Sequence, residues 1–138
     1  MSSYFLAWNR AMDFDGRSSR KEYWMFQLAN IFLMLALLFF AFVIAIIAAL
    51  ASHGTDTPLT EAALLANQIL FAVYICVSIF PSYACLVRRL HDTGKSATWT
   101  LLLAIPVLGF VVYVFAMFDS FPGPNRYGSS PKALTTEY

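Results

Sequence analysis

The residues best suited to chemistry lie in one polar stretch, residues 88–95, between two long apolar segments. His91 stands next to Asp92, and these residue types act as acid and base in many enzymes. Two arginines, Arg88 and Arg89, precede them and are suited to pairing with carboxylates or phosphates. Adjacent side chains at a helix end seldom converge on one substrate, and no nucleophile accompanies His91 and Asp92. We therefore expect no enzyme activity.

A second charged stretch, residues 13–22, stands before the first apolar segment. Its charged residues are Asp13, Asp15, Arg17, Arg20, Lys21 and Glu22. In one interpretation, acidic groups of this stretch pair with Arg88 or Arg89 at the membrane edge and lock two helices together. The expected acidic partner is Asp15 or Glu22.

Two other interpretations of these charges stay open. In the second, basic side chains of both stretches bind anionic lipid headgroups, each contributing about 1 kcal/mol near the membrane surface. The third is catalysis by His91 and Asp92. The candidate lipid or ion-pair cluster comprises Asp15, Arg17, Arg20, Lys21, Glu22, Arg88, Arg89, His91, Asp92, Asn125 and Arg126. We expect no cofactor, and no Cys or His spacing resembles a metal site.

Three apolar runs without a charged residue must position these polar stretches. The runs cover residues 23–51, 62–87 and 97–118. A membrane-spanning helix needs about 20 apolar residues, so each run is long enough. Hydrophobic residues make up 59% of the chain and charged residues 12%; soluble domains have about 45–50% and about 25%. The composition therefore predicts an all-α integral membrane protein.

Capping signals predict where the two long helices begin. Ser19 and Glu22 have the spacing of a capping box, so the first helix is expected to begin at Arg20. Thr57 is suited to cap the second helix, with Pro58 at its first position.

The third apolar run is interrupted near its middle by Pro106 and Gly109. Pro106 removes a backbone donor and Gly109 permits a sharp bend, so the run is expected to break at Pro106–Gly109. One alternative is a kinked third span, which leaves the tail outside. The other, which we favour, is a re-entrant hairpin that returns the tail to the cytoplasm and brings Asn125 and Arg126 beside His91.

The chain is expected to form a single membrane domain, residues 1–138. Phe5, Trp8 and Met12 share one helical face, which predicts a short N-terminal interfacial helix. The expected parts are a cytoplasmic interfacial segment 1–19, a first transmembrane helix 20–51, an outer loop 52–57, a second transmembrane helix 58–90, a cytoplasmic loop 91–96, a third apolar segment 97–118 and an irregular tail 119–138.

The distribution of basic residues predicts the orientation. Four Lys and Arg residues precede the first apolar run, none lies in the first loop, three lie in the second loop and two in the tail. By the positive-inside rule, the N-terminus and the second loop are cytoplasmic and the first loop is outside. The net charge of +1 argues against nucleic-acid binding.

Three motifs in order resemble one bacterial inner-membrane family. They are residues 14–24 (FDGRSSRKEYW), 88–94 (RRLHDTG) and 122–128 (PGPNRYG). Ile105-Pro106 with Gly109 also matches the third apolar segment of that family. The chain is thus similar to the domain of unknown function 805 family over roughly residues 5–131. The resemblance implies a fold and a bacterial inner-membrane location, but no reaction.

The expected function is a structural or regulatory role at the cytoplasmic membrane face. It would act through anionic membrane lipids, through a membrane-protein partner or through a homo-oligomer. The alternative is a subunit of an oligomeric transporter or channel. Three apolar segments are too few to enclose a pathway in one chain, and their interiors contain no charged residue.

Overall fold

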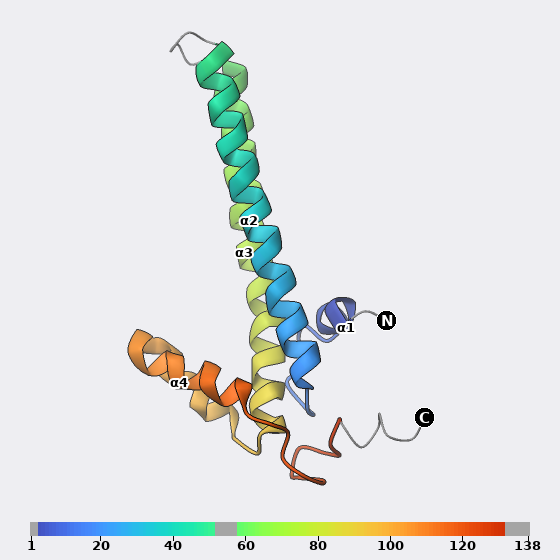
Figure 1. Ribbon diagram of the computed structural model, residues 1–138. Helices are drawn as coiled ribbons and strands as arrows, with labels where there is room; N and C mark the ends of the chain where they lie inside the picture. The colour runs from blue at the N-terminus through green and yellow to red at the C-terminus, as the bar shows by residue number, and fades with distance from the viewer. Residues whose placement is uncertain (1–2, 52–57, 132–138) are drawn as a thin grey trace. The chain divides into compact units, whose positions relative to one another are not determined.

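The computed structural model describes residues 3–51 and 58–131 (Figure 1). The chain divides into two units. Unit 1 comprises Met1–Gln27 and Phe80–Tyr138, and unit 2 comprises Leu28–Ile79. The elements are helices α1 (Ser3–Asn9), α2 (Arg20–Ala51), α3 (Pro58–Asp92) and α4 (Pro106–Met117), and a 3-10 helix, η1 (Ala97–Ala104). The predicted all-helical architecture is thus confirmed for the described residues. The predicted outer loop 52–57, including the Thr57 cap, lies outside them, as does the last part of the tail.

Helix α2 begins at Arg20, as the capping box predicts. The Ser19 hydroxyl accepts a hydrogen bond from the backbone N–H of Glu22 at 3.1 Å. This bond satisfies one of the free donors in the first turn of a helix. The position of this first turn determines where the side chains of Arg20, Lys21 and Glu22 lie.

Helix α3 ends at Asp92, two residues beyond the predicted end at Leu90. Gly94 has a φ of 79°, in the left-handed region, and terminates the helix. The Lys95 N–H donates to the Leu90 carbonyl at 2.9 Å, which closes the final turn. His91 and Asp92 therefore belong to the last helical turn, and the prediction that they begin a loop is wrong.

Two helices satisfy the length and hydropathy expected of membrane spans, over Arg20–Leu50 and Pro58–Asp92. The third apolar segment instead consists of η1 and α4, which lie side by side (Figure 1). The break falls at Ile105, whose backbone is extended with φ −115° and ψ 109°. A residue before proline disfavours the helical region, and proline suits the first helical position.

The predicted break at Pro106–Gly109 is therefore misplaced, because the helix is interrupted at Ile105 and both predicted residues belong to α4. Pro106 begins α4, and Gly109 lies buried inside that helix. A Cβ on Gly109 would lie only 3.3 Å from the Cα of Leu103. Gly109 thus permits close packing of α4 against η1 and does not form the bend.

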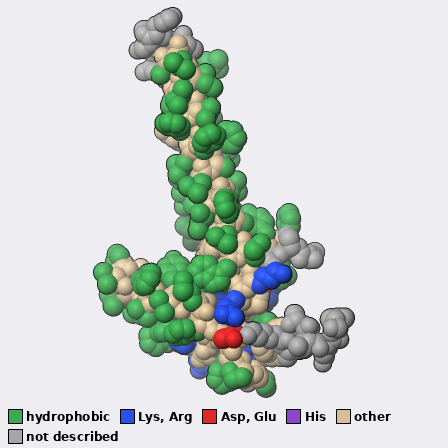
Figure 2. Space-filling view, in the orientation of Figure 1, with side chains coloured by type: hydrophobic (Ala, Val, Ile, Leu, Met, Phe, Trp, Pro, Cys, Tyr) green, Lys and Arg blue, Asp and Glu red, His purple; other side chains and the backbone are tan. Residues whose placement is uncertain are grey.

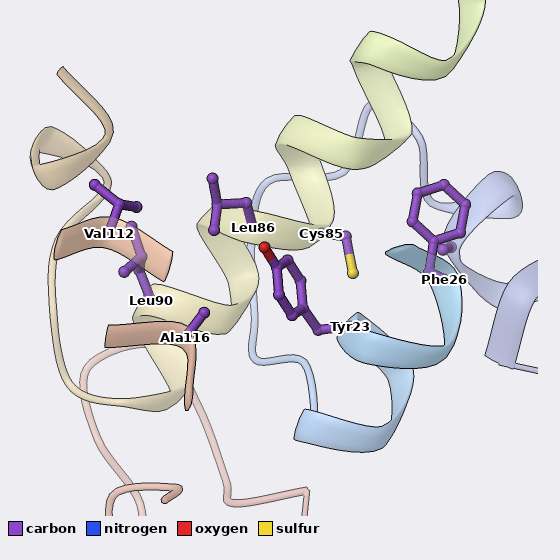
Figure 3. Packing of buried hydrophobic residues seen from close by; sticks show 8 residues of the cluster. Tyr23, Phe26, Cys85, Leu86, Leu90, Val112 and Ala116 are labelled. Atoms are coloured by element: carbon purple, nitrogen blue, oxygen red, sulfur yellow. The ribbon is translucent and has the colours of Figure 1, made fainter. Parts of the chain in front are cut away.

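A small apolar core joins the helices of unit 1 (Figure 3). Its buried members are Ala7 from α1, Tyr23 and Phe26 from α2, Cys85, Leu86 and Leu90 from α3, and Val112 and Ala116 from α4. Tyr4 of α1 stacks on Phe26 with a ring separation of 5.5 Å. Of the predicted interfacial face, Phe5 and Met12 are exposed, and Met12 lies beyond the end of α1.

Unit 2 contains the remaining parts of α2 and α3, and its surface is mostly apolar. Hydrogen bonds from side chains connect the helices here. The Tyr74 hydroxyl donates to the Asn30 side-chain oxygen. The Asn67 amide donates to the Leu37 carbonyl at 3.4 Å. These hydrogen bonds lie between the helices, while large apolar side chains such as Phe32 and Leu50 are exposed, as a lipid environment allows.

Candidate functional site

Asp92 lies at the centre of a buried polar cluster in unit 1. Its side chain is fully buried, and each carboxylate oxygen accepts at least one hydrogen bond. Oδ1 accepts from Nε of Arg17 at 2.9 Å. Oδ2 accepts from Nη1 of Arg89, and also from the Ser120 hydroxyl at 2.6 Å. The carboxylate therefore joins three segments that are far apart in sequence.

Arg17 connects this cluster to the tail. Its side chain is buried, and its two terminal nitrogens point to backbone carbonyls. Nη1 donates to the Gly123 carbonyl and Nη2 to the Phe121 carbonyl, both at 2.8 Å. The Phe121 N–H in turn donates to the Asp92 carbonyl at 2.8 Å. The tail is thereby held along the end of α3.

Arg89 connects α3 to the end of α4. Its Nε donates to the Ala116 carbonyl at 3.0 Å, and its Nη2 donates to the Phe118 carbonyl. The last carbonyls of a helix lack partners within it and form the negative end of its dipole. A guanidinium at this point satisfies these acceptors and benefits from the dipole. Arg89 also donates to the Ser18 carbonyl at 3.2 Å.

Arg88 connects α3 to the N-terminal segment. Its Nη1 donates to the carbonyls of Arg10, at 2.8 Å, and Asp13. Its Nη2 lies 3.6 Å from Oε1 of Glu22, so the predicted pairing of Glu22 with Arg88 is confirmed. Asp15 is exposed and does not form the alternative pair with either arginine among the described contacts. We refer to Arg17, Arg88, Arg89, Asp92 and Glu22 as the arginine hub.

His91 faces the tail beside the arginine hub. Its ring stacks on Tyr127 with centroids 3.6 Å apart and an interplanar angle of 5°. Its carbonyl accepts from the Asn125 side-chain amide at 2.9 Å, and the guanidinium of Arg126 lies 4.7 Å from the centre of the Tyr127 ring. The predicted placement of Asn125 and Arg126 beside His91 is therefore present in the structure.

Arg20 and Lys21 are two candidate residues that lie outside the arginine hub. Both side chains are exposed, unlike the three arginines of the hub. Arg20 has an ion pair with Asp119 at 3.5 Å, and about half of each side chain remains accessible (49% and 59%). The structure thus separates one predicted cluster into a buried set and an exposed set.

Several residues of the site were not predicted from the sequence. Ser18 and Ser120 bond to hub residues, and neither has a sequence signal that predicts this. Arg10 is hydrogen-bonded to Asp13 at 2.8 Å, an i,i+3 pair that could have been predicted from spacing. This hydrogen bond holds the pKa of the Asp13 carboxyl below its usual value. Among the described residues, no group of three His, Cys, Asp or Glu side chains is arranged to hold a metal ion.

Comparison with known proteins places the chain in a family. The family described as "Protein of unknown function (DUF805)" matches residues 11–129, which include the whole arginine hub. The chain belongs to the DUF805 family. This confirms the resemblance inferred from the three sequence motifs.

Two DUF805 relatives are named as inner membrane proteins. The chain is 36% identical over 133 residues to "Inner membrane protein YhaH" of Escherichia coli strain K12, a match that covers 96% of this chain and 98% of that protein. It is 35% identical over 134 residues to "Inner membrane protein YhaI" of the same strain, covering 96% and 97%. No solved structure matches the chain. With α2 and α3 long and apolar enough to span, the chain is a membrane protein of the inner-membrane type.

Proposed function

We propose that this DUF805 protein is a non-enzymatic structural module of the inner membrane, in which the arginine hub holds the tail as a fixed surface at the cytoplasmic face. The observation that carries this proposal is the use of the hub guanidiniums. Arg17, Arg88 and Arg89 are 7%, 0% and 0% exposed. They donate to carbonyls of the N-terminal segment, the end of α4 and the tail.

The energetics of burial support a structural role over catalysis. A charge that acts on a substrate must face the substrate, whereas these charges face protein atoms. Taking an unpaired charge out of water costs several kcal/mol, so a buried arginine is tolerated only with partners. The His91 ring is likewise covered by Tyr127, and the oxygens of the Asp92 carboxylate accept hydrogen bonds from protein donors. Neither group is presented to a reactant.

The same contacts favour a re-entrant hairpin for the third apolar segment. The segment follows the last turn of α3, which contains Arg89 and Asp92. It ends at Phe118, whose carbonyl accepts a hydrogen bond from Arg89, so both ends of the segment lie near the same turn of α3. With 8 residues in η1 and 12 in α4, the two arms are each about 16–18 Å long, roughly half of the ~30 Å hydrocarbon core. We propose that the hairpin enters the cytoplasmic leaflet and returns the tail to the cytoplasm.

The test of this topology uses single cysteines in a variant that lacks Cys76 and Cys85. Ser129 is exposed and lies in the tail, and Ser52 lies in the predicted outer loop. An impermeant maleimide added outside intact spheroplasts should label Ser52→Cys and spare Ser129→Cys until the membrane is opened. Labelling of Ser129→Cys from outside would show a spanning segment and refute the hairpin.

The test of the fixed tail uses a spin label at the same Ser129→Cys position. Asp92→Asn removes the carboxylate that binds Arg17 and Ser120, so the label should become more mobile in electron paramagnetic resonance spectra. Asp119→Asn is the matched control because it makes the same chemical change at an exposed carboxylate. Equal mobility in both variants would contradict a tail held by the arginine hub.

A further inference from the structure

An open groove of about 580 Å³ lies in unit 1, between the first turns of α2 and the last turn of α4. It is lined by Arg20, Lys21, Trp24, Met25 and Met117. On the face shown in Figure 2, Lys and Arg side chains gather beside hydrophobic side chains where α2 begins. The groove is therefore amphipathic, with two cations and three apolar side chains.

The exposure of these side chains distinguishes the groove from the arginine hub. The Arg20 side chain is 49% accessible. Met25 and Met117 are 51% and 53% exposed, so their apolar surface is accessible beside the two cations. Among the described residues, none forms an ion pair with Lys21. These groups are available to an external ligand.

We propose that the groove binds one phospholipid with an anionic headgroup. The lipid phosphate lies between Arg20 and Lys21, and an acyl chain runs along Met25 and Met117. Trp24 is held edge-to-face against Tyr23, with ring centroids 5.2 Å apart, and supplies the amphipathic ring typical of the headgroup level. The proposal goes beyond the structural role of the arginine hub and does not depend on it.

The order of groups along α2 supports a lipid as the occupant. Arg20 and Lys21 stand at the first two positions of the helix, and Trp24 and Met25 follow one turn later, towards the apolar run. A lipid presents charge and hydrocarbon in the same order from the surface inward. A free phosphate would use only the cations and would leave both methionines uncovered.

Asp119 weakens the binding of an anionic headgroup, whereas the two cations of the groove favour it. Its carboxylate lies 3.5 Å from the Arg20 guanidinium at the edge of the groove. A lipid phosphate must compete with this carboxylate for Arg20. A zwitterionic lipid gains less from the two cations because its own ammonium is repelled. The site therefore favours lipids with net negative charge.

The experiment titrates phosphatidylglycerol into the full chain in neutral detergent micelles and measures bound lipid by native mass spectrometry. Phosphatidylcholine is the reference lipid. The groove variant is Lys21→Gln, alone and together with Arg20→Gln. The matched control is Arg126→Gln, which removes one exposed positive charge outside the groove.

We expect each charge removed from the groove to weaken phosphatidylglycerol binding about fivefold. Arg126→Gln should leave binding within twofold of the parent chain. Equal weakening by Lys21→Gln and Arg126→Gln, or no weakening by the double groove variant, would overturn the site. Glycerol phosphate that displaced the lipid at equal concentration would overturn the lipid as the occupant.

Two further variants keep the proposal testable if the charge variants unfold. Asp119→Asn leaves both cations in place and removes the competitor, so phosphatidylglycerol should bind more tightly. Met117→Gln keeps every charge and should weaken binding of long-chain lipid more than that of a short-chain analogue. Unchanged binding in both variants would overturn the groove as the site. Because neither variant alters the arginine hub, a failure here is distinct from a failure of the proposed function.

Discussion

Helices α2 and α3 each contribute a part to unit 1 and a part to unit 2. The interactions that stabilise unit 1 internally differ from those that stabilise unit 2. In unit 1, buried arginines bond to carbonyls of the N-terminal segment, α4 and the tail. In unit 2, the cross-helix hydrogen bonds include the Tyr74–Asn30 and Asn67–Leu37 contacts, and many large apolar side chains are exposed. Lipid offers no hydrophobic drive for helix association, so unit 2 depends on packing and a few polar contacts.

The comparison shows where the sequence can tolerate buried charge. Unit 1 surrounds its charges with many backbone acceptors, because several chain ends and turns converge there. A continuous helix pair has no free carbonyls to offer, since its backbone groups bond within each helix. Charges of the hub type would therefore be destabilising if they were moved into unit 2.

The largest effect should come from Asp92→Asn in the arginine hub. The change removes the negative charge facing Arg17 and Arg89, and breaking a buried pair in this way costs about 3–5 kcal/mol. Thermal unfolding in detergent should show a strong loss of stability, with helicity of unit 2 partly retained. Asp119→Asn should have little effect because its ion pair is exposed. Similar losses for the two variants would contradict the central role of Asp92.

A smaller effect is expected at the end of α3, where Gly94 has a φ of 79°. Gly94→Ala forces an L side chain into the left-handed region, which costs about 1–2 kcal/mol. An added Cβ would make only ordinary contact with Phe121, at 3.4 Å, so the loss measures backbone strain. Gly94→Asn should lose less, because asparagine tolerates this conformation better. Equal unfolding midpoints for Ala and Asn would argue against strain.

Within unit 2, Tyr74→Phe removes the hydroxyl that donates to Asn30. Hydrogen bonds between helices in membranes contribute about 0.6 kcal/mol on average, so we expect a loss of that order. Hydrogen exchange should increase in unit 2 and stay unchanged around Asp92. Faster exchange around Asp92 would contradict an effect that is confined to unit 2.

The smallest effect concerns Asp13 at the edge of the arginine hub. The hydrogen bond from Arg10 lowers the pKa of the Asp13 carboxyl in the folded chain. A depressed carboxyl pKa stabilises the folded state above its usual value of about 3.9, and this contribution is lost as the pH falls through the folded pKa. Asp13→Asn should therefore flatten the loss of stability below about pH 4.

The control for Asp13 is Asp15→Asn, because the Asp15 side chain is exposed in the same turn. Both variants lose one negative charge at neutral pH. If unfolding curves between pH 3 and pH 6 changed equally in both, the hydrogen bond from Arg10 would not be the cause. The effect is small because about two fifths of the Asp13 side chain is accessible (42%).

Much of the fold followed from local sequence. Long uncharged runs predict spanning helices because a bilayer requires a continuous apolar length. Ser19 with Glu22 predicted the first residue of α2. Opposite charge at similar depth predicted that Asp15 or Glu22 pairs with Arg88 or Arg89, and Glu22 pairs with Arg88. These signals depend on neighbours in sequence or on position along the membrane normal, so one chain is enough to reveal them.

The tertiary structure decided which charges are buried. Arg17 and Arg20 stand in the same charged stretch, yet one binds Asp92 inside the protein and the other lines an open groove. Composition and spacing treat the two arginines alike. Only the fold brings Asp92, 75 positions away from Arg17, to one of them, because contacts between distant segments depend on how the whole chain turns at its ends.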